Sequence, residues 1–267
     1  MSRIVGGLIL AASLAAVVGW PTLTMVLEAA HGSSPTGAGG IVRPLGLALE
    51  TLKVVGAAEL IALPLGTVLA LLLTRTDLWG RRVMLALTTL ALFVPMPLHA
   101  LAWLGAFGNV GRMQAIGSTP LLVGWLGAAI VHAIAMVPWV VLLVGVGLRS
   151  VEPELEEAAL LDLPAWRVML RVTLRRSIGA IAAAALALAV LTAGDMTVTD
   201  LVQPPVRTYA EEVYTQTHLN HEPAAAAVVA LPPLLVLGLL VVVGSRWLMR
   251  ADPARIASAA IRARLWR

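Results

Sequence analysis

Six long apolar stretches, separated by shorter polar segments, constrain what this chain can fold into. A transmembrane helix needs about 20 consecutive, mainly apolar residues. Charged residues make up only 13% of the 267 residues, against about 25% in a typical soluble domain. The sequence therefore predicts a single all-α domain over 1–267, a polytopic membrane helix bundle of about six transmembrane helices. The predicted helices cover residues 4–27, 47–73, 83–106, 120–148, 177–197 and 224–247.

The basic residues are distributed unevenly between the segments that flank these stretches. Of the 19 lysines and arginines, all but Arg43, Lys53, Arg112 and Arg207 lie in one alternating set of segments, which includes both ends of the chain. Because loops rich in basic residues stay in the cytoplasm, we expect both termini to be cytoplasmic. The same placement explains the sequence pI near 10.6, so no nucleic-acid partner is expected.

The first stretch has two interpretations. It could be a signal peptide cleaved after Ala30, because it has a short basic start, then an apolar run, then the residues that lead to this alanine. The apolar run is long for a signal peptide, which favours a retained helix. Cleavage would leave the topology of the remaining helices unchanged.

The third and fourth stretches contain helix-breaking and ionisable residues, namely Pro95, Pro97, His99, His132 and Pro138. Proline kinks a helix by removing one hydrogen bond and clashing with the preceding turn. Ionisable groups in membrane segments usually face the bundle interior or a water-filled cavity. One interpretation is a kinked helix pair that lines a translocation pathway, with His99 and His132 facing it. The alternative is two neutral histidines bonded to nearby carbonyls, which we favour for each histidine taken alone.

The fifth stretch is rich in alanine, and small side chains let helix backbones approach closely. It predicts a helix packed at the centre of the bundle. Asp195, Thr197 and Asp200 follow where this helix reaches the outer side. They are candidate pathway residues near an outer gate; the alternative is that Asp195 caps or bonds a neighbouring helix.

The segment 150–176 is the longest basic loop on the cytoplasmic side. Pro153 suits the first turn of a helix, and Pro164 ends that helix and precedes a second one leading into the fifth stretch. The segment thus predicts a short amphipathic helix joined to a transmembrane helix, which could pass movement of a cytoplasmic partner to the bundle. A charged loop lying on anionic headgroups is the alternative. The apolar stripe is Leu155, Ala159 and Leu163, and the basic face is Arg167, Arg171 and Arg175.

This segment resembles the EAA loop of bacterial ABC importer permeases, whose pattern is EAA, three residues, Gly, nine residues and Ile-x-Leu-Pro. Glu157–Ala159 match the first triplet, while Leu163 stands where the family has Gly. Eight residues then precede Val172–Leu174, and Arg175 replaces the final Pro. The resemblance implies a coupling helix that docks on an ATPase. The residues it assigns to coupling are Leu155, Glu156, Glu157, Ala158, Ala159, Asp162 and Leu163.

The resemblance extends to the helix arrangement, that of the MetI-like superfamily, the inner membrane components of binding-protein-dependent transport systems. FVPMPLHALAW (93–103) and LTAGDMTVTDLVQ (191–203) resemble segments of ferric-iron permeases. The resemblance implies a multi-pass protein of the bacterial inner membrane. The implied partners are ABC ATPase subunits, a second permease copy or paralogue, and a periplasmic or lipid-anchored binding protein. It implies ferric iron as substrate, with thiamine, polyamine, and sulfate or molybdate as alternatives.

No enzyme motif accompanies these features. The sequence contains no GxxxxGK[ST] phosphate loop, no nucleophile elbow and no HExxH, so no catalytic residue and no cofactor are expected. The outer segment 204–223 holds tyrosines, carboxylates and histidines, which are possible metal ligands. We favour a surface that contacts a binding protein over a metal site. A membrane enzyme, an ion-conducting protein and a non-transporting scaffold remain the alternatives of another class.

Overall fold

The computed structural model describes residues 12–13, 15–31, 42–109, 111–202 and 204–251. Within these ranges the regular secondary structure is helical and contains no strand, which confirms the all-α prediction. The predicted stretch 4–27 lies partly outside the described residues. The part that is described contains a π-helical turn, η1 (Ala15–Gly19), and helix α2 (Trp20–His31).

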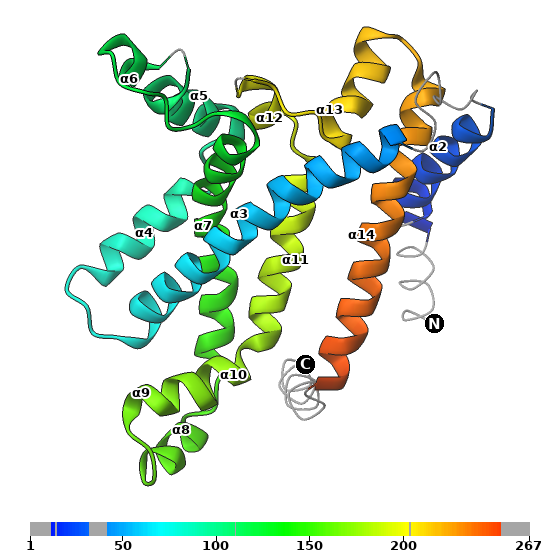
Figure 1. Cartoon of the computed structure of the whole chain (residues 1–267). Coiled ribbons are helices and arrows are strands. Elements are labelled where there is room, and N and C mark those ends of the chain that lie inside the picture. The colour runs from blue at the N-terminus through cyan, green and yellow to red at the C-terminus, as the bar shows by residue number, and fades with distance from the viewer. Residues whose placement is uncertain (1–11, 14, 32–41, 110, 203, 252–267) are drawn as a thin grey trace.

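Three helices form the centre of the bundle: α3 (Val42–Arg75), α7 (Gly124–Arg149) and α11 (Ile178–Gly194). They pack against one another, with α3 crossing α7 diagonally (Figure 1). The largest apolar core lies where they meet, and Val140, Val144 and Leu148 of α7 are fully buried there. The alanine-rich α11 is packed against α3, α7 and α14 as expected. The helix that buries most of its length is nevertheless α7.

The predicted third stretch, 83–106, is not one helix, and this expectation is wrong. It is divided into α4 (Arg81–Ala91) and α5 (Met96–Phe107). Helix α4 and the following segment Met96–Ala115 are bent by 104° relative to each other. The turn after α4 tightens into bonds from each amide to the carbonyl three residues back. Pro95, with extended backbone, then precedes α5, and Pro97 lies in its first turn, where a missing amide hydrogen costs nothing. The proline pair therefore separates two helices instead of kinking one.

The described residues contain three helices long and apolar enough to cross a membrane, α3, α7 and α14 (Pro223–Ala251). Two bent pairs raise this to five if each pair is one span. The first pair joins α4 to α5 and α6 (Arg112–Ala115), and the second joins residues 165–176 to α11 at a bend of 59°. A shorter apolar helix, Ala15–Ala30, lies at the first predicted stretch. The predicted number of about six spans is thus approached only by counting broken helices.

Short helices cover the end of the bundle opposite the 150–176 loop (Figure 1). After α11 the chain forms α12 (Thr197–Leu201), which packs on α5. It then forms α13 (Tyr209–Tyr214) and the π-helical η3 (Thr215–Leu219), which lead into α14. The hydroxyl of Tyr209 donates to the carbonyl of Pro44, 2.9 Å away, and so ties α13 to the start of α3. At the same end α14 packs against α2.

The closest approach between α7 and α11 lies near their ends beside the 150–176 loop. A Cβ atom added at Gly147 would overlap the Cβ of Ala180. We expect Gly147→Ala to lower the free energy of unfolding by about 1–3 kcal/mol, the usual cost of overpacking. Thermal unfolding of the detergent-purified protein measures this. Gly244→Ala in α14 is the matched control, because nothing lies within 4 Å of that position. Equal melting temperatures for the two variants would contradict the proposed contact.

Candidate functional site

The loop 150–176 folds into two short helices that extend beyond the bundle (Figure 1). Helix α8 (Pro153–Leu160) has Pro153 at its first position, as expected, and acidic residues in its first turn. Pro164 precedes α9 (Ala165–Val168), which continues through the π-helical η2 (Met169–Thr173) and α10 (Leu174–Arg176). The order of elements is the one predicted from the two prolines.

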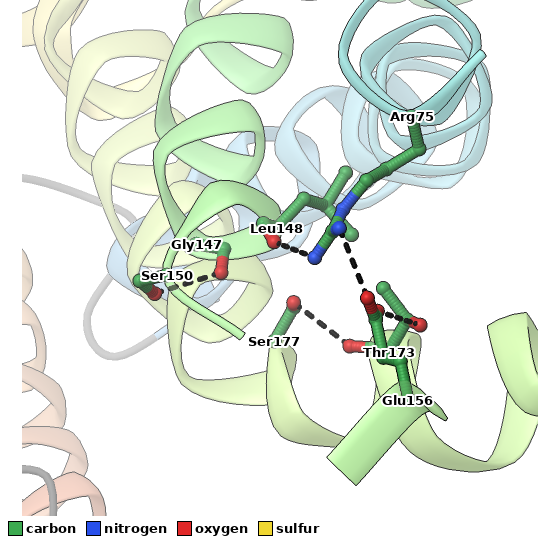
Figure 2. A network of polar contacts seen from close by, with 7 residues as sticks. All are labelled: Arg75, Gly147, Leu148, Ser150, Glu156, Thr173 and Ser177. Carbon is green, nitrogen blue, oxygen red and sulfur yellow. Dashed lines mark hydrogen bonds and ion pairs between the residues drawn. The ribbon is translucent and has the colours of Figure 1, made fainter. Parts of the chain in front are cut away.

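Glu156 of α8 points back toward the bundle and joins three parts of it (Figure 2). Its Oε2 accepts from Nη1 of Arg75 at 3.1 Å, and its Oε1 accepts from the hydroxyl of Thr173 at 2.5 Å. The other terminal nitrogen of Arg75 donates to the carbonyl of Leu148, near the end of α7. The two charged side chains are only 18% and 25% exposed. A partly buried ion pair therefore connects α8, α3, α7 and η2.

Further polar contacts hold the base of the loop. The hydroxyl of Ser177 donates to the carbonyl of Thr173 at 2.9 Å, and that of Ser150 donates to the carbonyl of Gly147 at 2.8 Å (Figure 2). Arg176 forms an ion pair with Glu152 at 3.3 Å. The base of the loop is thus bonded to α3 and to the end of α7, and its second half is bonded to Ser177 at the start of α11.

The hairpin exposes large apolar side chains beside charged ones. The exposed fractions are 49% for Leu160, 86% for Leu161 and 57% for Trp166. Among the residues predicted for coupling, four are exposed: Leu155, Glu157, Ala158 and Asp162. Ala159 and Leu163 are half-buried, and Glu156 faces the bundle.

The sequence analysis did not single out Leu160, Leu161 or Trp166. The sequence did contain a feature that could have indicated them. They are large apolar residues close to Pro164, on a loop that is too polar to form a core of its own. Such residues need a covering partner.

At the opposite end the structure brings two of the predicted pathway residues together. Nε2 of His132 lies 3.2 Å from Oδ2 of Asp195, and Nδ1 of His132 lies 2.8 Å from the carbonyl of Ala128. Asp195 also accepts from the backbone amide of Val198 at 3.0 Å and so caps α12. His132 is fully buried. This geometry matches the packing interpretation of both residues.

The other candidate pathway residues lie apart from this pair. Thr197 and His99 are half-buried, and Asp200 is exposed. No hydrogen bond joins His99 or Asp200 to His132 or Asp195 in the described part of the chain.

The outer segment contains a ladder of hydrogen bonds along one helix face. The amide of Gln216 donates to Glu212 at 2.7 Å, and the amide of Asn220 donates to Gln216 at 2.9 Å. Burial raises the pKa of the neighbouring Glu211, and the charge of Arg207 opposes that increase. Within the described ranges no three His, Cys, Asp or Glu side chains form a group that could hold a metal ion.

The apolar helices and the loop bonded to one end of the bundle define the chain as a polytopic helical membrane protein with a short helical hairpin at that end. The family model described as "binding-protein-dependent transport system inner membrane component" matches residues 62–254. The chain belongs to this family, and it is a permease subunit of an ABC importer. The match includes α7, α11 and the whole 150–176 loop.

Solved structures have the same fold at low sequence identity. A bacterial ABC transporter that imports the acidic polysaccharide alginate is 16% identical, with a TM-score of 0.68 over 93% of this chain and 96% of that chain. A bacterial alginate ABC transporter in complex with an alginate pentasaccharide-bound periplasmic protein is 15% identical, with a TM-score of 0.67 over 95% of this chain and 95% of that chain. The inward-facing MetNI methionine ABC transporter is 16% identical, with a TM-score of 0.61 over 82% of this chain and 99% of that chain. No curated protein compared with the chain matches it significantly.

Proposed function

We propose that this permease is driven by a separate ATPase, which docks on the α8–α9 hairpin. The observation that carries this proposal is the hairpin itself: it is bonded to α3 and α7 through Glu156 and Arg75, yet it exposes Leu160, Leu161 and Trp166. An exposed apolar surface on a charged loop is stabilised when a partner covers it. The matched positions Glu157–Ala159 of the EAA loop lie on the same helix.

ATP would be bound by the partner and not by this chain. Closure of two ATPase subunits would move α8, and the ion pair would pass that movement to α3 and α7. A second permease copy or a paralogue would complete the pathway. A binding protein would deliver substrate at the opposite end, as the periplasmic protein does in the alginate complex.

Ferric iron is the substrate that we propose. Its support is the resemblance of two segments to ferric-iron permeases, and these segments include α5 and α12, which pack on each other. Ala100 of the first segment shares a buried cluster with Val198 and Val202 of the second. Two matching segments that form one packed unit support the subgroup more strongly than two separate matches would.

ATP-dependent uptake by proteoliposomes that contain the assembled transporter tests this substrate. We expect accumulation of radioactive ferric iron, with thiamine, polyamine, sulfate and molybdate as the comparison substrates. Uptake of one of these instead of iron would reject the iron assignment and keep the permease.

The same assay separates the two roles of Asp195. If the carboxylate faces the pathway, Asp195→Asn should reduce uptake about tenfold, the effect of about 1.4 kcal/mol, while the amide oxygen preserves the bond to Val198. Thermal unfolding and ATPase co-purification should remain near wild-type values. Normal uptake would leave Asp195 with only the packing role that its contacts with His132 and Val198 already describe.

The orientation that we propose puts both termini and the α8–α9 hairpin in the cytoplasm, because the arginine-rich segments alternate along the chain. Reporter fusions after Arg81 and after Arg267 should therefore read cytoplasmic. A fusion near Gly39 should read external, and a cytoplasmic result there would exclude this topology.

A further inference from the structure

A basic cavity of about 320 Å³ lies where the end of α3, the start of α4 and the end of α7 meet. Its walls combine three guanidinium groups with one hydroxyl and two apolar side chains. The lining residues are Leu73, Thr74, Arg81, Arg82, Leu85 and Arg149. Neither the hairpin nor the residues proposed for the pathway contribute to it.

The positive charge of this cavity is only partly neutralised within the chain. Arg81 pairs with Asp77 at 3.0 Å and also donates to the carbonyl of Thr76 at 2.7 Å. For Arg82 and Arg149 the described part of the chain provides no hydrogen bond or ion pair. Arg82 and Arg149 are exposed and line the same cavity. Their like charges repel each other, and an anion bound between them would offset that repulsion.

The cavity adjoins a helix face that suits lipid. None of the residues of α4 is buried, and Val83, Leu87 and Leu90 are between 60% and 64% exposed. Trp79, in the turn before α4, is 96% exposed, as is typical of an aromatic residue at the membrane interface. A ligand with an anionic head and apolar tails would satisfy both surfaces at once, whereas a free phosphate ion would satisfy only the arginines.

We propose that this cavity binds the headgroup of an anionic phospholipid from the arginine-rich side of the membrane, with its acyl chains along α4. Arg82 and Arg149 contact the phosphate, and Arg81 lies on the same wall. Basic pockets between transmembrane helices on the cytoplasmic side are suited to such headgroups. The proposal depends on the chain being a membrane protein and not on its substrate or its ATPase.

Native mass spectrometry of the full-length protein in mild detergent tests this site. The protein is titrated with phosphatidylglycerol and with phosphatidylcholine of identical acyl chains. We expect wild-type protein to bind phosphatidylglycerol more tightly. The variant Arg82→Gln/Arg149→Gln should lose about thirtyfold in affinity for phosphatidylglycerol, from about fivefold for each arginine near an anionic lipid. Arg112→Gln/Arg246→Gln removes the same charge from exposed positions outside the cavity and outside the basic face of the 150–176 loop, and should retain the wild-type affinity.

Any of the following four outcomes would overturn the proposed lipid site. Equal binding of the two lipids by wild-type protein does so without any variant, so the test does not depend on whether the variants fold. An equal loss in both double variants would mean that only net charge matters. Inorganic phosphate binding as tightly as phosphatidylglycerol would assign the cavity to a soluble anion. A changed oligomeric state of the Arg82 and Arg149 variant, with unchanged lipid affinity, would assign it to a second copy of the chain.

Discussion

Leu161→Arg is expected to leave folding and membrane insertion intact, to abolish co-purification with the ATPase and to stop uptake. Leu161 is 86% exposed at the end of α8, so its replacement disturbs no packing within the chain. In a docked complex the arginine would be forced into an apolar contact, where an unpaired charge is poorly solvated. A pull-down with the tagged permease and a parallel uptake assay measure both losses.

Leu219→Arg is the matched control, because Leu219 is 65% exposed and lies at the opposite end of the bundle. It should retain ATPase binding. The alternative, in which the loop lies on anionic headgroups, predicts that an added arginine strengthens membrane attraction by about 1 kcal/mol. Full recovery of the ATPase with Leu161→Arg would therefore reject the docking role. Ala159 is a less clear test position, because it is half-buried against its own chain.

Arg75→Met is expected to reduce uptake about tenfold or more while the ATPase stays bound and hydrolyses ATP. The substitution leaves the carboxylate of Glu156 partly buried without its cation and removes the donor to the Leu148 carbonyl. Losing a hydrogen bond to a charged group costs about 1.5–3 kcal/mol. The hairpin would then remain folded but lose its direct bond to α3 and α7. Coupled measurements of ATP hydrolysis and uptake in proteoliposomes detect this separation.

Glu156→Gln should have a smaller effect, because the amide oxygen can still accept from Arg75 while the amide nitrogen donates to the hydroxyl of Thr173. The double variant should resemble Arg75→Met alone if the two residues act as one pair. Arg246→Met is the control for loss of charge, since Arg246 is exposed on α14 and lines no described cavity. If the losses of uptake caused by Arg75→Met and Glu156→Gln add up in the double variant, the two residues do not act as a direct pair.

The helical class of the fold could be predicted because apolar stretches of membrane length have few alternatives in water or lipid. The division at Pro95 could not, because a proline removes the same hydrogen bond whether a helix kinks or ends. The outcome depends on what the two halves pack against. For the same reason the alanine content of α11 predicted close packing but not that α7 would be the most buried helix.

The candidate site was predicted in outline and not in its contacts. In the sequence itself Pro153 marks the start of α8 and Pro164 the start of α9, whereas α8 ends at Leu160, before Pro164. The bond between Arg75 and Glu156 joins residues 81 positions apart, and that between His132 and Asp195 joins residues 63 apart. No local pattern in a single sequence indicates such pairs. Which residues of the stripe face outward depends on the same long-range contacts.

The two attachments between α7 and α11 limit how this permease can change shape. At one end Gly147 lets the helices touch at Ala180, and at the other His132 is bonded to Asp195. A close contact at one end and a hydrogen bond at the other oppose scissoring and sliding of the two helices. An alternating-access cycle would therefore carry α7 and α11 as one rigid body. The change of angle would fall at the two existing bends, between α4 and α5 and between α10 and α11.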